Sequence, residues 1–186
     1  MSGLTVQPTG IAGVMQVSRL PWIDERGCFS RLFDHSVLAA AGWPDGVAQV
    51  NLSVTRHAGT VRGLHYQHPP HAEAKLVSCI RGRVFDVAVD LRAGSSTFGA
   101  WHAAELSAEN CIALLIPPGC AHGFQALSDD ATLVYCHSAP WVAAAEAGIS
   151  VHDPSLAIAW PLPVTGLSRR DAALPALPVN FPRLET

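Results

Sequence analysis

Residues Lys75–Leu91 read KLVSCIRGRVFDVAVDL, and this stretch decides the fold class of the chain. From Val84 to Leu91 the residue character alternates with a period of two, as in a β-strand whose two faces have different surroundings. The apolar run Lys75–Ile80 precedes that strand, and the segment Arg81–Arg83, centred on a glycine, is typical of a turn. We therefore predict a β-hairpin here, in a chain built mainly from β-strands.

Further short strands are predicted on both sides of the hairpin, at residues 49–55, 101–106, 112–116, 124–127 and 132–137. Pro117-Pro118-Gly119 indicates a turn between two of them. Short strands at this spacing, separated by Gly and Pro, are typical of a β-sandwich or β-barrel. A length of 186 residues suits roughly one domain, and the chain shows neither repeats nor a linker, so we predict a single domain over residues 1–186.

Helices are expected to be short and peripheral. One is predicted at residues 35–41, with Asp34 as its N-cap and Gly42 closing it. A helical turn is predicted at residues 168–173, where Ser168 is a candidate cap. The proline-rich tail, residues 161–186, is expected to wrap around the barrel mainly as extended chain.

The composition excludes several classes of protein. Hydrophobic residues make up 49% of the chain and charged residues 15%, which indicates a well-buried globule and not a disordered chain. A net charge of −3 provides no general attraction to nucleic acid or anionic lipid, so neither is expected as a partner. No apolar run approaches the about 20 residues of a membrane span. The five cysteines lack metal-site or disulfide-framework spacing, and reduced thiols predict a cytoplasmic location.

Lysine is used once. Of the twelve basic residues, eleven are arginine and one is Lys75. A position that keeps lysine is expected to need a compact ammonium group with three rotatable donors, where arginine offers only a planar fork. The alternative is that codon bias causes the arginine excess and chance left one lysine.

The segment Arg62–Gln67, RGLHYQ, carries the strongest local signal of a site. A glycine inside a strand often marks a β-bulge or a close backbone approach. A bulge at Gly63 brings Arg62 and His65, which strict alternation puts on opposite faces, into one cavity. The alternative is the end of a hairpin with a surface arginine and a hydrogen-bonded histidine.

Four histidines raise the question of a metal site. His65, His68, His71 and His122 are candidate ligands on a β-barrel. Metal-binding barrels of this kind usually carry two histidines at i and i+2, which share one strand face. Here the spacing is three, and two prolines precede His71, so the pattern favours a site without metal.

Two further features each allow two interpretations. Gln49, Asn51 and Ser53 share one face of a predicted strand, opposite three apolar residues, and form either a solvated face or the polar wall of a pocket. Tyr66 and Tyr135 are the two tyrosines of the chain. Each either packs in the core or, if it faces a pocket, is able to donate a proton.

Taken in order, the motifs of the chain resemble the dTDP-4-dehydrorhamnose 3,5-epimerase (dTDP-4-keto-6-deoxyglucose 3,5-epimerase) family over nearly its whole length. The stretches that carry the resemblance are Asp24–Gly27, Gln49–Ser53, Arg62–Gln67, Lys75–Val77, Gly82–Arg92, Ser96–Gly99, Ile116–Gly119, Ala121–Phe124, Asp153-Pro154 and Leu167–Asp171.

The resemblance implies a mainly β, cupin-type barrel (a double-stranded β-helix, or jelly roll) with short peripheral helices. It also implies a homodimer in which the N-terminal segment, about residues 1–50, is exchanged across the interface. The family works without a metal or another cofactor, so none is expected. The implied ligand is a nucleotide-linked sugar.

The resemblance assigns roles to particular residues. His65 corresponds to the catalytic base, Asp171 to its carboxylate partner, Tyr135 to the proton donor, and Lys75 to the lysine beside the developing enolate. Other residues correspond to substrate-contacting positions, namely Arg26, Gln49, Asn51, Arg62, His122, Glu146 and Arg170. These types suit the chemistry, because a proton next to a ketone needs a base near neutral pH and a cation at the ketone oxygen.

The chain departs from the family pattern on the side expected to hold the nucleotide. Arg31, two residues after Phe29, stands where the family usually has an acidic residue. A carboxylate only accepts hydrogen bonds and a guanidinium only donates them. Pro140-Trp141 replaces a pair of tyrosines, and Cys136 replaces a lysine. We expect Phe29, Arg31 and Trp141 to contact the nucleotide, whose base is then a candidate to differ from thymine.

The function expected from this resemblance is epimerisation at C3, C5 or both of a nucleotide-linked 4-keto-6-deoxy sugar, in deoxysugar (dTDP-rhamnose-like) biosynthesis. A sugar-nucleotide 3,4-ketoisomerase is the nearest alternative enzyme. Two more distant candidates are a non-catalytic cupin that only binds a sugar nucleotide and a metal-dependent cupin.

Overall fold

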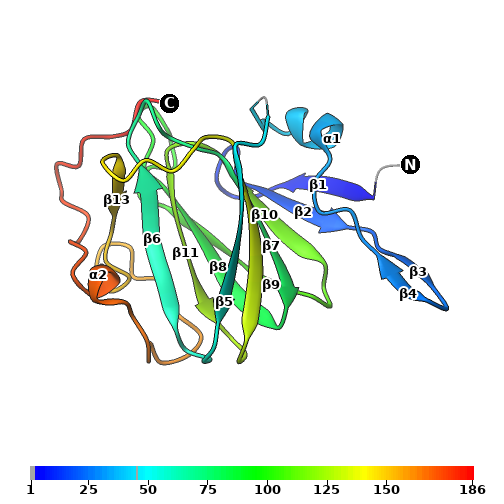
Figure 1. Cartoon of the computed structure of the whole chain (residues 1–186). Helices are drawn as coiled ribbons and strands as arrows, with labels where there is room; N and C mark the ends of the chain where they lie inside the picture. The colour runs from blue at the N-terminus through cyan, green and yellow to red at the C-terminus, as the bar shows by residue number, and fades with distance from the viewer. Residues whose placement is uncertain (1–2, 45) are drawn as a thin grey trace.

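The structure, a computed structural model, describes residues 3–44 and 46–186. Two antiparallel sheets face each other and form the barrel (Figure 1). The six-stranded sheet has the order β1 (Leu4–Pro8), β2 (Met15–Arg19), β10 (Ile112–Ile116), β7 (Lys75–Arg81), β12 (Ala131–His137) and β5 (Gln49–Thr55). The five-stranded sheet has the order β13 (Glu146–Gly148), β6 (Val61–Gln67), β11 (Cys120–Ala126), β8 (Arg83–Asp90) and β9 (Trp101–Ser107). The mainly β fold class is as predicted.

The hairpin predicted from Lys75–Leu91 is wrong, although both of its strands exist. β7 pairs with β10 and β12 in one sheet, whereas β8 pairs with β9 and β11 in the other. Gly82, at φ +69°, redirects the chain from one sheet to the other between them. Alternation along a strand reports its two faces and not its neighbours, so the local pattern could not exclude this crossover.

The other strand predictions vary in accuracy. Those at 49–55 and 112–116 match β5 and β10, and those at 101–106 and 132–137 each fall one residue short. The strand predicted at 124–127 begins earlier, at Cys120, and ends at Ala126. Short strands were missed at both ends of the chain, including β1, β2, β13 and the separate hairpin of β3 (Trp22–Asp24) and β4 (Gly27–Phe29).

Both short helices are where the capping signals predicted them. Helix α1 covers His35–Ala39, and the Asp34 carboxylate accepts a hydrogen bond from the Ser36 backbone N–H at 3.1 Å. Helix α2 covers Arg169–Ala172, and the Ser168 hydroxyl accepts one from the Asp171 N–H at 3.0 Å. Helix α1 ends two residues before the predicted end.

Apolar side chains form three clusters, one between the sheets and one on each outer face. The cluster between the sheets includes Val77, Leu114 and Phe124. The outer face of the five-stranded sheet is covered by side chains of the C-terminal tail, among them Leu177 and Phe181. The remaining cluster packs Leu38 and Trp43 against the six-stranded sheet. The part of the barrel interior that these clusters leave unfilled is the site described below.

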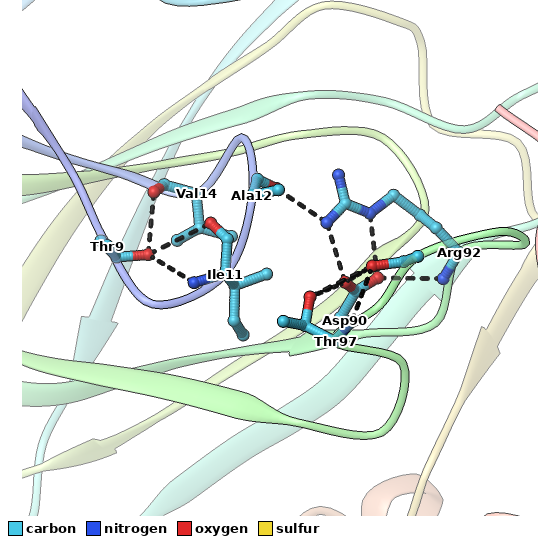
Figure 2. A network of polar contacts seen from close by, with 8 residues as sticks. Thr9, Ile11, Ala12, Val14, Asp90, Arg92 and Thr97 are labelled. Carbon is cyan, nitrogen blue, oxygen red and sulfur yellow. Dashed lines mark hydrogen bonds and ion pairs between the residues drawn. The ribbon is translucent and has the colours of Figure 1, made fainter.

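One end of β8 is tied to the N-terminal segment by a buried polar network (Figure 2). The carboxylate of Asp90, which is fully buried, accepts hydrogen bonds from Arg92 Nε at 2.9 Å and from Thr97 Oγ1 at 2.7 Å. Arg92 Nη2 also donates to the carbonyl of Ala12, in the turn between β1 and β2, at 2.7 Å. Burial opposes ionisation of Asp90, but the hydrogen bonds outweigh it and hold its pKa well below the ordinary value.

Candidate active site

A cavity of about 630 Å³ lies inside the barrel, between β5, β7 and β12 of one sheet and β6 and β11 of the other. All four residues predicted to be catalytic line it. Six of the residues predicted to contact substrate line it as well. Together these are Asn51, Arg62, His65, Lys75, His122, Tyr135, Trp141, Glu146, Arg170 and Asp171.

His65 and Asp171 form a hydrogen-bonded pair on the cavity wall. His65 Nε2 lies 2.8 Å from Asp171 Oδ1, and the His65 side chain is 29% exposed whereas that of Asp171 is 6% exposed. Because an ionised carboxylate only accepts, Nε2 carries the proton and Nδ1 is the basic nitrogen. Burial lowers the pKa of His65 below its ordinary value, and the Asp171 carboxylate partly opposes that shift. His65 is therefore neutral at physiological pH, as a base must be.

The bulge predicted at Gly63 is confirmed and explains how His65 reaches the cavity. In the pairing of β6 with β11, His65 lies opposite His122 and Arg62 lies opposite Phe124. Three steps along β6 thus match two along β11, so β6 holds one extra residue, and Arg62 and His65 both face the cavity. Gly63 has φ +125°, and a Cβ there would come within 2.6 Å of the backbone of β11.

Lys75 lines the cavity from β7, in the sheet opposite the one that carries His65, and its side chain is 8% exposed. Its Nζ is 3.0 Å from Glu73 Oε1 and donates to the His65 carbonyl at 3.4 Å. His137 lies opposite Lys75 in the pairing of β12 with β7. Burial, and then the charge of Lys75, lowers the pKa of His137 to about 4. His137 is therefore uncharged at neutral pH.

His122 and Tyr135 are neighbours on the cavity wall. His122 Nε2 is 2.8 Å from Asp86 Oδ1, and both side chains are buried. The ring of Tyr135 meets that of His122 edge-on, with centroids 6.0 Å apart. Burial, and then the nearby Asp86 carboxylate, raises the pKa of Tyr135 far above its ordinary value. The hydroxyl of Tyr135 therefore keeps its proton at neutral pH.

The mouth of the cavity is organised around Trp141. Its backbone N–H donates to Gln49 Oε1 at 2.6 Å, and its indole N–H donates to Glu146 Oε2 at 2.8 Å. Arg170 forms an ion pair with the same Glu146 oxygen at 2.9 Å. Gln49 does not line the cavity itself, and its contact with the site is this hydrogen bond from Trp141. The indole ring stays 56% exposed and available for contact with a ligand.

The polar face of β5 is a pocket wall. Asn51 and Ser53 line the cavity, and Leu52 between them also contributes to its wall. On the other face, Val50 and Val54 are 64% and 46% exposed. The predicted polar row is thus part of the cavity wall, and Asn51 is exposed there.

Three residues predicted to contact substrate lie away from the cavity of their own chain. Arg26 and Phe29 belong to the β3–β4 hairpin, which extends away from the barrel (Figure 1). Arg26 forms an exposed ion pair with Asp24 at 2.6 Å. Arg31 forms an ion pair with Asp34 at 2.7 Å. A single chain does not bring them together with His65.

The four histidines with candidate metal-ligand roles are dispersed. His65 and His122 each pair with a carboxylate, and His68 and His71 lie exposed in the segment after β6. Within residues 3–44 and 46–186, no group of three or more His, Cys, Asp or Glu side chains is placed to hold a metal ion. Over the same residues, no helix is long and apolar enough to cross a membrane.

Sequence reasoning missed four polar residues of the site. Glu73 and His137 line the cavity beside Lys75, Gln67 binds Glu73, and Asp86 binds His122. One signal was available for Asp86, since an acidic residue in the middle of an apolar strand is rarely buried without a partner. For Glu73 the available signal was its position two residues before Lys75, with which it forms an ion pair.

Three comparisons with known proteins agree. The family model of dTDP-4-dehydrorhamnose 3,5-epimerase matches residues 8–178. The chain is 42% identical to a dTDP-4-dehydrorhamnose 3,5-epimerase of Sinorhizobium fredii, with 94% of this chain and 92% of the relative covered. It is 43% identical to a dTDP-4-dehydrorhamnose 3-epimerase of Streptomyces niveus, over 90% of this chain and 81% of that one.

The chain belongs to the dTDP-4-dehydrorhamnose 3,5-epimerase family. It is therefore an isomerase of the carbohydrate epimerase type, and its barrel is of the cupin type. The crystal structure of the Legionella pneumophila family member in complex with dTDP-4-keto-L-rhamnose superposes with a TM-score of 0.90 at 38% identity, and the match covers 98% of this chain and 100% of that one.

Proposed function

We propose that this epimerase removes and returns a proton at C3, C5 or both of a nucleotide-linked 4-keto-6-deoxy sugar, with His65 as the base. The observation that carries the proposal is the convergence of the His65–Asp171 pair, Lys75 and the Tyr135 hydroxyl on one cavity. The relatives named for the same reaction, and the one whose structure holds dTDP-4-keto-L-rhamnose, support the substrate class.

In this mechanism a neutral His65 takes the proton from the carbon next to the ketone, and the Asp171 carboxylate stabilises the imidazolium that forms. The electron pair moves to the ketone oxygen, where the ammonium of Lys75 stabilises the negative charge of the enolate. Tyr135 then returns a proton to the opposite face of the carbon. One histidine is unable to serve both faces, so inversion needs the second donor.

The test compares wild type with His65→Asn in deuterated water. We expect the variant to fold but to lose turnover by at least about 100-fold, because a positioned general base contributes about 10²–10⁴-fold. NMR of the product from dTDP-4-keto-6-deoxyglucose identifies which carbons are inverted. If the substrate takes up deuterium from the solvent as fast with His65→Asn as with wild type, the proposal is contradicted. A product whose carbonyl group has moved to another carbon also contradicts it.

A homodimer with exchange of the N-terminal segment is the second part of the proposal. Trp22, Ile23 and Phe29 on the β3–β4 hairpin are 66%, 76% and 71% exposed, which is unusual for large apolar side chains on a protruding arm. The outward face of β5 is apolar as well. In the proposed dimer, a partner subunit covers these surfaces, and Arg26 and Phe29 of one chain reach the cavity of the other. This arrangement accounts for the distance of Arg26 and Phe29 from His65 of their own chain.

The nucleotide and the location complete the proposal. Arg31, held by Asp34, brings a donor where the family usually has an acceptor, so we propose that the base differs from thymine or is held differently. Titration with dTDP, CDP, GDP and UDP tests this, and a clear preference for dTDP rejects a different base.

The free thiols of the described residues support a reducing, cytoplasmic location.

A further inference from the structure

The buried ammonium of Lys75 has a specific anionic neighbour. Lys75 Nζ lies 3.0 Å from Glu73 Oε1, and the two side chains are 8% and 6% exposed. Among the carboxylates that the structure describes, Glu73 is the one within ion-pair distance of Lys75. A charge this deeply buried is costly unless it is paired, and Glu73 supplies the pairing charge for Lys75.

Glu73 is itself held on its second oxygen. Gln67 Nε2 donates to Glu73 Oε2 at 2.8 Å, and the same amide nitrogen donates to the Pro140 carbonyl at 3.2 Å. Gln67 Oε1 accepts from the backbone N–H of Val142 at 2.6 Å. The carboxylate is therefore fixed between Lys75 and the segment that carries Trp141 at the cavity mouth.

The hydrogen-bond geometry of Lys75 leaves one donor for a ligand. An ammonium group has three N–H donors. One is directed at Glu73 Oε1 and a second, longer one at the His65 carbonyl. Because Lys75 lines the cavity, the third N–H is free to meet an oxygen of a bound sugar.

We propose that Glu73 is a positioning residue that balances the buried charge of Lys75 and directs its free N–H at the ketone oxygen of the substrate. The inference rests on the proposed role of Lys75 and adds a residue behind it. Glu73 acts on the reaction through Lys75, as Asp171 acts through His65. The site thus contains two parallel pairs, one for the base and one for the cation.

The first experiment replaces only the charge. Glu73→Gln keeps the shape of the side chain, and Glu109→Gln, at an exposed position, is the matched control. We expect Glu73→Gln to lower kcat by about 10- to 100-fold, since misplacing a catalytic group costs up to about 10²-fold. The dissociation constant of dTDP should stay within about twofold, because Glu73 serves the sugar side. An unchanged kcat, or a lower kcat accompanied by much weaker dTDP binding, overturns the proposal.

The second experiment is a double-mutant cycle with Lys75→Met. If Glu73 acts through Lys75, the double variant is no slower than Lys75→Met alone, because the effects of coupled residues do not add. A further loss equal to that of Glu73→Gln in the wild type overturns the proposal. If Lys75→Met alone keeps wild-type turnover, the role of Lys75 itself fails, which is a distinct outcome.

Folding is checked in each variant by thermal melting. The double variant leaves no buried charge unpaired, so it separates lost turnover from lost stability. Should Glu73→Gln fail to fold, Glu73→Asp serves in its place, since it keeps the charge but withdraws it by one carbon. A loss of kcat with unchanged dTDP binding in that variant supports the proposal, and wild-type kcat overturns it.

Discussion

At the scale of single residues, burial holds three side chains of the site in one protonation state at neutral pH. His65 is neutral because burial lowers its pKa, and Tyr135 is protonated because burial raises its pKa. His137 is uncharged because burial, and then Lys75, lowers its pKa to about 4. The proposed base is thus neutral and the proposed acid is protonated, as the proposed mechanism requires.

Tyr135→Phe should separate the two proton transfers. We expect net inversion to fall by about 100-fold or more while His65 continues to exchange the substrate proton with solvent, because only the returning proton is lost. Deuterium incorporation followed by NMR beside product formation measures both. Tyr66→Phe, at the other tyrosine of the chain, is the matched control. Normal inversion in Tyr135→Phe would show that another group is the acid.

Asp171→Asn should change both the rate and its dependence on pH. The Asp171 carboxylate raises the pKa of His65 against the larger effect of burial, so its removal lowers that pKa further. At low pH, kcat/KM falls because His65 becomes protonated. The pH at which this fall occurs should therefore be lower in Asp171→Asn. The maximal rate should fall by about 100-fold or more, because the imidazolium loses its stabilising charge. Asp129→Asn, on the surface, is the control, and an acid limb that moves to higher pH contradicts the assignment.

At the scale of elements, a single helical turn positions the carboxylate of the site. Helix α2 has four residues, Arg169–Ala172, and depends on its cap because so short a helix has little stability of its own. Its N-cap, Ser168, accepts a hydrogen bond from the backbone N–H of Asp171. Strand β6 contributes through its bulge, which turns His65 towards that carboxylate.

Ser168→Ala tests the coupling between cap and catalysis. Loss of an N-cap costs about 1 kcal/mol, so a modest loss of stability in urea unfolding is expected. If the cap positions Asp171, kcat should also fall, and Ser168→Thr, which keeps the hydroxyl, should restore both. A loss of stability with unchanged kcat would mean that Asp171 is held by His65 and the Gly63 backbone N–H alone.

At the scale of the whole molecule, two features are incomplete in one chain. The β3–β4 hairpin extends from the barrel with large apolar side chains exposed, and β5 presents an apolar face at the edge of its sheet. Both suit burial against a second copy of the chain. Completion of the nucleotide site by Arg26 and Phe29 of that copy would make activity depend on assembly.

Val50→Glu should therefore weaken the dimer. Val50 is 64% exposed and does not line the cavity. A charge placed in an apolar interface is costly to bury, so we expect the mass measured by light scattering at micromolar concentration to fall towards that of one chain. Activity should fall in parallel at the same dilution. Val179→Glu is the matched control, since Val179 is also exposed but lies in the C-terminal tail. If Val50→Glu keeps the wild-type mass, the outer face of β5 is not in the interface.

The sequence by itself determined the mainly β class, both helix caps and the candidate residues of the site, because each depends on local patterns or on ordered motifs. Alternation revealed β5 and β8, capping residues revealed α1 and α2, and the glycine of RGLHYQ revealed the bulge of β6. The family motifs identified His65, Lys75, Tyr135 and Asp171 as residues of one site.

Only the tertiary structure decided which strands are neighbours and which groups support the catalytic residues. The segment Arg81–Arg83 joins two sheets instead of two paired strands, because strand pairing depends on the long-range fit of whole surfaces and not on the residues of the turn. Glu73 and Lys75 are two positions apart, but only folding buries their ion pair and brings Gln67 to it. Asp86 meets His122 because β8 pairs with β11. The positions of Arg26, Phe29 and Arg31 show the same limit, since contacts made through folding and assembly leave no local pattern in the sequence.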